Sequence, residues 1–303
     1  MTSLLSFLTL TFAMLVLGAL LQRLRQAEAM ANSFNWWSLN VALPAVVLEL
    51  LPALPWHATL WYLVASQWLG FVVAFVVIGW LGRLLGWTPG RTAAVILMCG
   101  ASNTAFIGYP MIEAMRGRDG LSLAVIADQL GCMPVIAVGG ALVAALYSGH
   151  ARPGSREILK RIALFPAFWA IWIGFTLGAL HLNWPDAVAQ TLHRVGQSMG
   201  PLVLFAIGLR LRLTLPRAER GAIFLSMGWK LLLAPAATLA LGWLLGVSGL
   251  ILTVAVLQMA MAPMFTAAMI CHHHKLDPDL ANSVVSVGLL LSFATVPLWN
   301  AWL

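Results

Sequence analysis

Long apolar stretches separated by short polar connections dominate this chain. Each stretch has about the 20 residues that an α-helix needs to cross the hydrocarbon core of a bilayer, and charged residues collect between the stretches. The pattern predicts an all-α integral membrane protein with ten spanning helices. Their approximate ranges are 3–21, 32–51, 58–82, 91–115, 120–147, 158–181, 195–212, 223–245, 249–271 and 279–302.

Composition agrees with this prediction and narrows the class of protein. Of the 303 residues, 61% are hydrophobic and only 9% are Asp, Glu, Lys or Arg, against about 25% in soluble domains. So few charges exclude a soluble enzyme. Cys99, Cys132 and Cys271 lie inside apolar stretches without metal-type spacing, so we expect neither a disulfide framework nor a metal site, and we expect no cofactor.

The net charge of +7 indicates topology rather than a nucleic-acid partner, because basic residues near helix ends are retained on the cytoplasmic side. One set of alternate connections holds thirteen of the seventeen bases, and the opposite set, which includes both termini, holds three. We therefore expect a multi-pass protein of the cell membrane whose termini both lie outside the cytoplasm. The thirteen are Arg23, Arg25, Arg83, Arg91, Arg152, Arg156, Lys160, Arg161, Arg210, Arg212, Arg217, Arg220 and Lys275, and the three are Arg116, Arg118 and Arg194.

The two halves of the predicted bundle are related. A division into residues 1–150 and 151–303 leaves five spans on each side, and an odd number places the halves in opposite orientations, as in an inverted repeat. The second and seventh spans each have a proline followed by an aliphatic run, at Pro44 and Pro201. The sequence therefore predicts two inverted five-helix repeats.

Two predicted helix breaks indicate a binding site. Asn103, Gly108 and Pro110 interrupt the fourth span, and Pro263 interrupts the ninth. Each proline should free the carbonyl four residues earlier, and freed backbone groups in a membrane belong beside protein, water or ligand. Half-helix N-termini favour an anion. The alternative is a pair of kinked helices without a site.

Five strings of residues resemble helices of bacterial members of the auxin efflux carrier family, in the bile/arsenite/riboflavin transporter superfamily. The string in the fourth span is the most specific, and together the strings extend over nearly the whole chain. They occupy residues 34–45, 101–110, 127–131, 230–235 and the stretch from 277–281 to 295–298.

This resemblance implies the fold of bile acid:sodium symporters and sodium/proton antiporters, with two broken helices that cross. It implies a scaffold at about 3–51 and 158–212 and a mobile transport unit at about 58–147 and 223–302, which moves as an elevator. Bacterial members move carboxylates such as malonate, malate or lactate, and the resemblance also implies a homodimer. Relatives often have Asn four residues after the ninth-span proline, where this chain has Ala267, so one expected polar ligand is missing.

Polar residues inside the predicted spans are the candidates for contacts with a substrate. Asn103 and Thr104 offer a donor and acceptors beside the first break, although Asn103 could instead cap the broken helix. Asn40 could face the same cavity or bind a neighbouring helix. The full set predicted for substrate binding is Asn103, Thr104, Gly108, Pro110, Asn40, Pro263, Met261 and Thr266.

Asp128 is the candidate for coupling to a proton, because burial disfavours the charged form of a carboxylate. A fixed carboxylate bonded to freed backbone is the alternative. With sodium as the coupling ion, Gln129 or Gln258 would help to coordinate it. We expect Lys230 to reach the cytoplasmic interface along its flexible side chain and Glu49 to lie at a solvated headgroup position.

These observations predict a secondary active carrier for a small organic anion, coupled to protons or sodium, with the lipid bilayer as its surroundings. Intramembrane prenyltransferases need paired Asp-rich motifs and metalloproteases need His-Glu-x-x-His, and the sequence has neither, so we do not expect an enzyme. A membrane sensor that binds its ligand without moving it is a further alternative.

Overall fold

The computed structural model describes residues 2–54, 57–148, 163–211 and 216–303, with side chains from residue 9 onward. In these ranges every regular element is helical, apart from one isolated bridge between Ser102 and Pro263. The prediction of an all-α membrane protein is confirmed. Five helical runs are long and apolar enough to cross a membrane: Ala27–Ala53, Ala58–Leu84, Gly108–Tyr147, Arg217–Leu244 and Pro278–Trp302.

The predicted division into two halves and the predicted orientation both depend partly on residues outside these ranges. The boundary between 1–150 and 151–303 falls in the stretch 149–162. Five of the bases that predict the orientation also lie outside the described residues, namely Arg152, Arg156, Lys160, Arg161 and Arg212. The ten-span count and the orientation of the termini therefore stay predictions.

The chain forms two compact units, each made of segments that are distant in the sequence. The first unit comprises Met1–His57, Ala105–Val125 and Leu159–Leu211. The second comprises Ala58–Thr104, Ile126–Ile158 and Arg212–Leu303. The chain changes from one unit to the other inside the predicted fourth and fifth spans, after Thr104 and after Val125.

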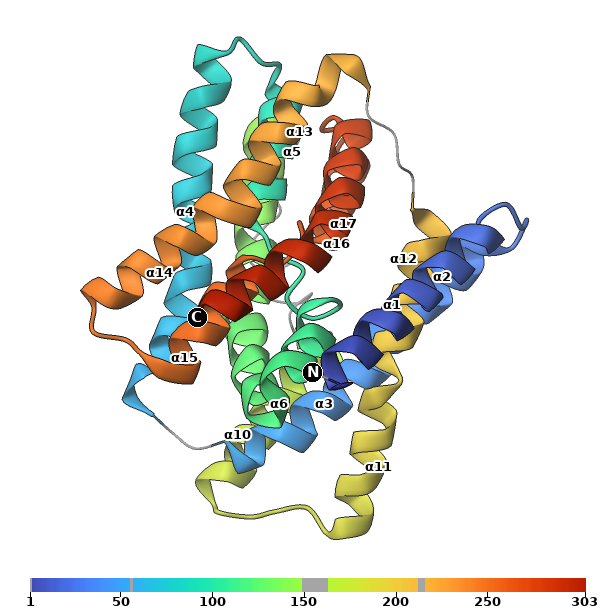
Figure 1. The fold of residues 1–303 in the computed structure, drawn as a ribbon, viewed down its shortest axis with the longest axis vertical. Helices are drawn as coiled ribbons and strands as arrows, with labels where there is room; N and C mark the ends of the chain where they lie inside the picture. The colour runs from blue at the N-terminus through green and yellow to red at the C-terminus, as the bar shows by residue number, and fades with distance from the viewer. Residues whose placement is uncertain (1, 55–56, 149–162, 212–215) are drawn as a thin grey trace. The chain divides into compact units, whose positions relative to one another are not determined.

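In the first unit, α1 packs against α12, and α3 packs against α10 and α11 (Figure 1). Gly18 and Gly208 allow the closest approach: a Cβ on Gly18 would lie 2.4 Å from the carbonyl oxygen of Phe205. Small residues at such crossings are typical of membrane helices. The helices of this unit are α1 (Thr2–Leu21), α2 (Ala27–Trp37), α3 (Leu43–Leu50), α6 (Gly108–Ile126), α10 (Pro166–Ala179), α11 (Asp186–Gln197) and α12 (Met199–Arg210).

The predicted seventh span, 195–212, is wrong at its start. The chain there forms two helices that meet at Ser198, of which only α12 is a continuous apolar stretch, from Met199 up to its last residue, Arg210. The preceding α11 is amphipathic, and a search for continuous apolar stretches misses a helix whose apolar residues occupy one face. The junction is held by a hydrogen bond from Trp37 Nε1 to Ser198 Oγ (3.0 Å).

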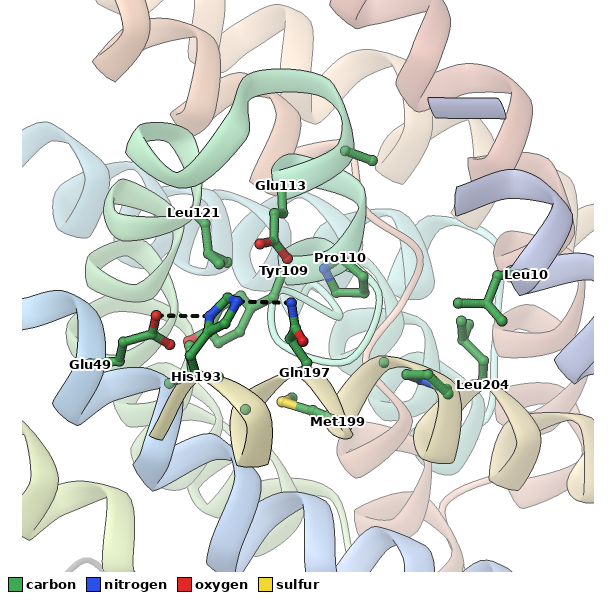
Figure 2. Close-up of a pocket in the computed structure, with 15 residues that line it drawn as sticks. Leu10, Glu49, Tyr109, Pro110, Glu113, Leu121, His193, Gln197, Met199 and Leu204 are labelled. Carbon is green, nitrogen blue, oxygen red and sulfur yellow. Dashed lines mark hydrogen bonds and ion pairs between the residues drawn. The ribbon is translucent and has the colours of Figure 1, made fainter. Parts of the chain in front are cut away.

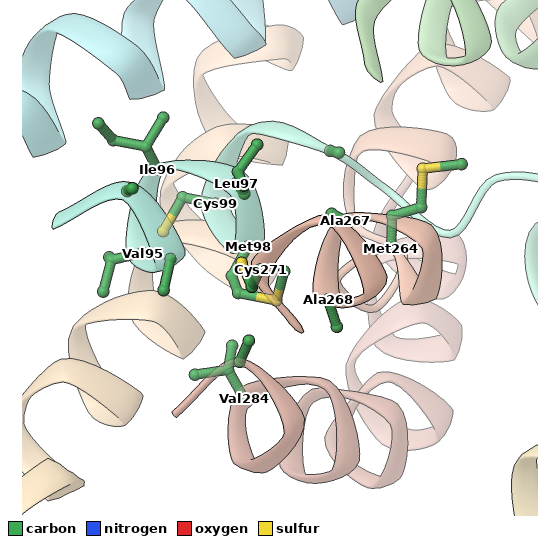
Figure 3. Packing of buried hydrophobic residues seen from close by; sticks show 14 of the residues in the cluster. Val95, Ile96, Leu97, Met98, Cys99, Met264, Ala267, Ala268, Cys271 and Val284 are labelled. Carbon is green, nitrogen blue, oxygen red and sulfur yellow. The ribbon is translucent and has the colours of Figure 1, made fainter. Parts of the chain in front are cut away.

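The second unit is built around α5, whose residues from Thr92 to Gly100 are all buried. Its side chains pack on α16 and α17 through residues such as Met264, Ala268 and Val284 (Figure 3). Ala267 is fully buried in this core, so the position where relatives often have Asn serves packing here. The helices are α4 (Trp61–Leu84), α5 (Pro89–Gly100), α7 (Met133–Val135), α8 (Ala141–Tyr147), α13 (Arg220–Met227), α14 (Ala234–Leu244), α15 (Gly249–Met259), α16 (Phe265–His273) and α17 (Pro278–Trp302).

Four π-helical segments interrupt the long helical runs of the described residues; one is Ile136–Gly140, and each of the other three is followed by one residue and then a proline. These three are Ser38–Ala42 before Pro44, Ala127–Cys132 before Pro134 and Gly228–Leu233 before Pro235. Proline has no N–H and its ring crowds the preceding turn, and the hydrogen-bond pattern widens there. Such π segments are frequent at functional sites.

Two parts of the second unit repeat each other at a spacing of 160 residues. Leu-Gly-x-Leu-Leu-Gly occurs at 81–86 and at 241–246, and each copy ends its helix in the same way. Gly86 and Gly246 have positive φ angles of 63° and 70°, which glycine adopts without strain. The next residue bonds back to the first glycine, from Trp87 N to Gly82 O (2.9 Å) and from Val247 N to Gly242 O (2.8 Å).

Candidate functional site

The helical chain is interrupted at both predicted breaks, and the two interruptions pair with each other. α5 ends at Gly100 and α15 ends at Met259. Beyond these ends the two segments of the chain run antiparallel. Asn103 N donates to Ala262 O (2.8 Å) and Met264 N donates to Ala101 O (3.1 Å). We call residues 101–104 and 260–264 the crossover. Their pairing satisfies backbone groups that helix ends leave open.

The prolines do not cause the breaks in the predicted way. Pro110 lies in the first turn of α6, where a backbone N–H is not needed, and Phe106 precedes that helix. Pro263 lies in the extended stretch after α15 has already ended. The bonds around Pro110 nevertheless fit the predicted release of the Phe106 carbonyl, because Tyr109 N donates to Ala105 O and Met111 N donates to Ile107 O while Pro110 has no N–H to donate. The release of the Met259 carbonyl by Pro263 stays a prediction.

A buried hydrogen-bond network surrounds Asp128, whose exposed fraction is 0%. The carboxylate accepts hydrogen bonds from Thr104 Oγ1 and from Gln129 Nε2, the latter at 2.7 Å. Gln258 Nε2 donates to the backbone oxygen of Thr104 (3.3 Å). The three predicted coupling residues thus gather around one residue of the crossover.

Lys230 is also fully buried, so the prediction that it reaches the interface is wrong. Its Nζ donates to Ser102 Oγ at 2.5 Å and lies 3.9 Å from Met259 Sδ. Ser102 follows the C-terminus of α5 and Met259 is the last residue of α15. Because helix C-termini carry a negative partial charge, this position stabilises a cation without a carboxylate partner.

Lys230 and Asp128 are the charged residues that are buried within the described part of the chain. Both lie in π-helical segments, as does Asn40. Ionisable residues inside a membrane protein are costly and typically mark a functional site. The two buried charged residues therefore lie in π segments and not in the helix breaks.

The other predicted substrate residues divide between the two units. Asn103 and Met261 are buried in the crossover together with Pro263, and the half-buried Thr266 is the second residue of α16. Asn40, Gly108 and Pro110 belong to the first unit. Their assignment to substrate binding stays a prediction.

The described hydrogen bond of the Asn40 side chain lies within its own helical run. Its Nδ2 donates to the carbonyl of Trp36 (2.9 Å), four residues earlier in the same helical run. A short polar side chain in a helix can bond the backbone of the preceding turn, and the amide is used in that way here.

The first unit contains a cavity of about 510 Å³, which is lined mainly by apolar side chains (Figure 2). Pro110 is one of its lining residues. Four polar residues at the cavity, Glu49, Glu113, His193 and Gln197, were not predicted as site residues. Two of them lie on α11, and the polar face of that helix was the signal that could have found them.

Glu49 is not at the solvated position that was predicted. Its side chain is 8% exposed and is paired with Arg118 Nη2 and with His193 Nδ1, the latter at 2.9 Å. His193 Nε2 in turn lies 2.8 Å from Gln197 Nε2. Among the described residues, no cluster of three or more His, Cys, Asp or Glu side chains could hold a metal ion.

Known proteins resemble the chain over nearly its whole length. The family described as membrane transport protein matches residues 1–300. An uncharacterized transporter of Methanothermobacter thermautotrophicus is 28% identical, over 98% of this chain and 95% of that protein.

Two more relatives are also uncharacterized transporters. MJ1031 of Methanocaldococcus jannaschii is 24% identical over 69% of this chain and 68% of its own length. YfdV of Escherichia coli is 25% identical over 90% of this chain and 88% of its own length. The relatives are thus transporters rather than enzymes, and the family match confirms the resemblance found in the sequence. The chain belongs to the membrane transport protein family that is also called the auxin efflux carrier family.

Proposed function

We propose that the protein is a secondary active transporter that moves a small organic anion, a mono- or dicarboxylate, across the cell membrane. The observation that carries this proposal is Lys230, a fully buried cation at the crossover that is held by a hydroxyl and by helix ends rather than by a carboxylate. A carboxylate substrate would supply the negative charge that this cation lacks.

The hydroxyl of Ser102 extends the same site. Its oxygen accepts a hydrogen bond from Lys230, so its own hydrogen is free to be donated to a bound carboxylate. In this account Asn103 and Thr266 flank the bound carboxylate.

Asp128 is our candidate for coupling to protons. As a carboxylate it accepts two hydrogen bonds, and a proton on one oxygen would remove one acceptor and loosen the network around Thr104. Proton uptake would also offset the charge of the anion. The oxygens of Asp128, Thr104, Gln129 and Gln258 favour sodium as the second candidate, because sodium binds to oxygen ligands.

The transport movement in this proposal is an elevator motion of the unit that contains the crossover. Ten spans in two inverted repeats, two outward termini and a homodimer belong to the same proposal. Support comes from the 160-residue repeat, whose two copies lead into segments that pair antiparallel. Further support comes from the two compact units, although residues 105–125 group with the first unit.

Uptake by proteoliposomes tests the proposal. Labelled lactate, malonate and malate are offered under separately imposed proton, sodium and voltage gradients. We expect at least one carboxylate to accumulate when the proton gradient is imposed. Accumulation that follows sodium alone would assign the sodium mechanism, and the absence of uptake for all three anions under every gradient would contradict the proposal.

A further inference from the structure

The cavity of the first unit carries a charge that the proposed function does not use. Its volume of about 510 Å³ is in the range of pockets that enclose small organic ligands. Apolar side chains from α1, α3, α6 and α12 form most of its wall, including Leu10, Val46, Leu121, Met199 and Leu204. The polar groups gather where α3, α6 and α11 contribute to it (Figure 2).

Three of these polar groups, Glu49, His193 and Gln197, form a chain of contacts with Arg118, which does not itself line the cavity. Arg118 pairs with Glu49, Glu49 pairs with His193 Nδ1, and His193 Nε2 contacts the amide nitrogen of Gln197. In the arrangement with the amide nitrogen of Gln197 facing the ring, Nε2 accepts from that nitrogen and Nδ1 donates to Glu49. The contacts are thus all satisfied by a neutral imidazole.

Glu113 takes no part in this chain of contacts, and its carboxylate is directed into the cavity beside Tyr109 (Figure 2). Two carboxylates, those of Glu49 and Glu113, thus lie at this end of the cavity, and the one guanidinium among these groups, that of Arg118, is paired with Glu49. The apolar wall lowers the local dielectric and strengthens the interaction of Glu113 with a bound charge. The cavity is therefore complementary to a cation and repels an anion.

We infer that this cavity binds an amphipathic organic cation, whose protonated amine donates to Glu113 while its apolar body packs against the leucine-rich wall. The carboxylates proposed as substrates have the opposite charge, so this ligand is of a different class. The inference does not rest on the proposed function, because it uses only the lining and charges of the first unit.

Calorimetric titration of the purified protein in lipid nanodiscs tests the inference, with empty nanodiscs as the background. The probes are hexylamine, hexanol and hexanoate, which share one apolar body and differ in charge. We expect hexylammonium to bind at least tenfold more tightly than hexanol, and hexanoate to bind most weakly. Equal affinities for the amine and the alcohol would overturn the inference.

Two substitutions assign the binding to this cavity. Glu113→Gln keeps the shape of the side chain and should remove the preference for the amine over the alcohol. The matched control is Asp119→Asn, an exposed acid that follows the non-helical Gly117 and does not line the cavity, and it should keep the preference. A preference that survives Glu113→Gln would contradict the inference.

A third variant tests the wall and does not depend on the folding of Glu113→Gln. Ala114 lines the cavity, so Ala114→Leu should narrow it and weaken hexylammonium binding at least fivefold. Unchanged hexylammonium binding by Ala114→Leu would place the ligand elsewhere and overturn the inference.

Discussion

The crossover of the second unit and the cavity of the first unit differ in how their charged side chains are buried and paired. At the crossover, Lys230 and Asp128 are completely buried and each bonds to a different residue of one extended segment, Ser102 or Thr104. At the cavity, Glu49 is neutralised by cationic and imidazole partners while Glu113 faces open volume. The first arrangement buries a cation and a carboxylate, and the second leaves one carboxylate, that of Glu113, outside the ion-paired chain.

The difference follows from local backbone structure. The crossover residues are positioned by helix ends and by π segments next to proline, which turn polar side chains inward at fixed points. The polar end of the cavity instead depends on α11, an amphipathic helix that lies on α3. The two regions therefore position their charged side chains through different local structures.

The largest expected effect comes from removing the buried cation. Lys230→Met keeps the length and apolar stem of the side chain but deletes the charge, and we expect carboxylate uptake to fall at least 100-fold. An apolar replacement for a buried charge is often tolerated by the fold, so the protein should still be purified as a monodisperse species. Initial uptake rates in proteoliposomes give the measurement.

Lys275→Met is the matched control for this variant, because Lys275 is exposed in the same unit. Its uptake should stay within twofold of the wild type. If Lys230→Met also transported at the wild-type rate, the assignment of the anion site to the crossover would be wrong.

The second effect concerns coupling and is smaller. Asp128→Asn keeps a carbonyl oxygen that can accept from Thr104 but cannot take up a proton in the pH range of transport. We expect the stimulation of uptake by an imposed proton gradient, proposed for the wild type, to disappear in this variant, while binding of the anion persists. If uptake by this variant still responded fully to the proton gradient, Asp128 would be a structural carboxylate and not the coupling residue.

The third effect is on stability and compares helix packing in the two units. Gly18→Val in the first unit forces a side chain against backbone atoms of α12, and we expect a loss of about 2 kcal/mol in the free energy of unfolding. Gly221→Ala in the second unit meets nothing within 4 Å, so helix propensity should stabilise it by up to about 1 kcal/mol. Thermal unfolding in detergent should shift in opposite directions, and a shared direction would refute the packing at Gly18.

The smallest effect distinguishes the two helix starts that follow the copies of Leu-Gly-x-Leu-Leu-Gly, which lie 160 residues apart. The Thr88 side chain caps α5 by accepting from the backbone N–H of Arg91 (3.3 Å), whereas the equivalent Ser248 makes no such cap for α15. Thr88→Ala should therefore cost about 1 kcal/mol and Ser248→Ala close to nothing. Equal shifts in the two melting temperatures would show that the two helix starts do not differ.

Much of the fold follows from sequence because burial in a membrane makes apolar length informative. The apolar stretches predicted the helical class and located both interruptions, and the gathering of Asp128, Gln129 and Gln258 near Thr104 is consistent with that location. Lys230 was misjudged because its direction is set by a π segment, and a hydropathy pattern does not register a widened helical turn.

The polar residues of the cavity were not predicted from the sequence, for a different reason. Its polar residues come from separate helices, and neither Glu49 nor His193 is informative until α3 and α11 pack together. The polar face of residues 186–197 is visible in the sequence, but continuous apolar runs do not identify an amphipathic helix. A hydropathy pattern does not predict side-chain partners that depend on tertiary packing.

Counterflow in proteoliposomes tests the central claim most directly, because it requires a carboxylate to bind and to cross without any ion gradient. Vesicles with wild-type protein are loaded with unlabelled carboxylate and diluted into a trace of the same labelled anion. The account predicts transient accumulation of label by the wild type and none by Lys230→Met. Label that binds to the wild-type protein without accumulating, or equal accumulation by both proteins, would contradict it.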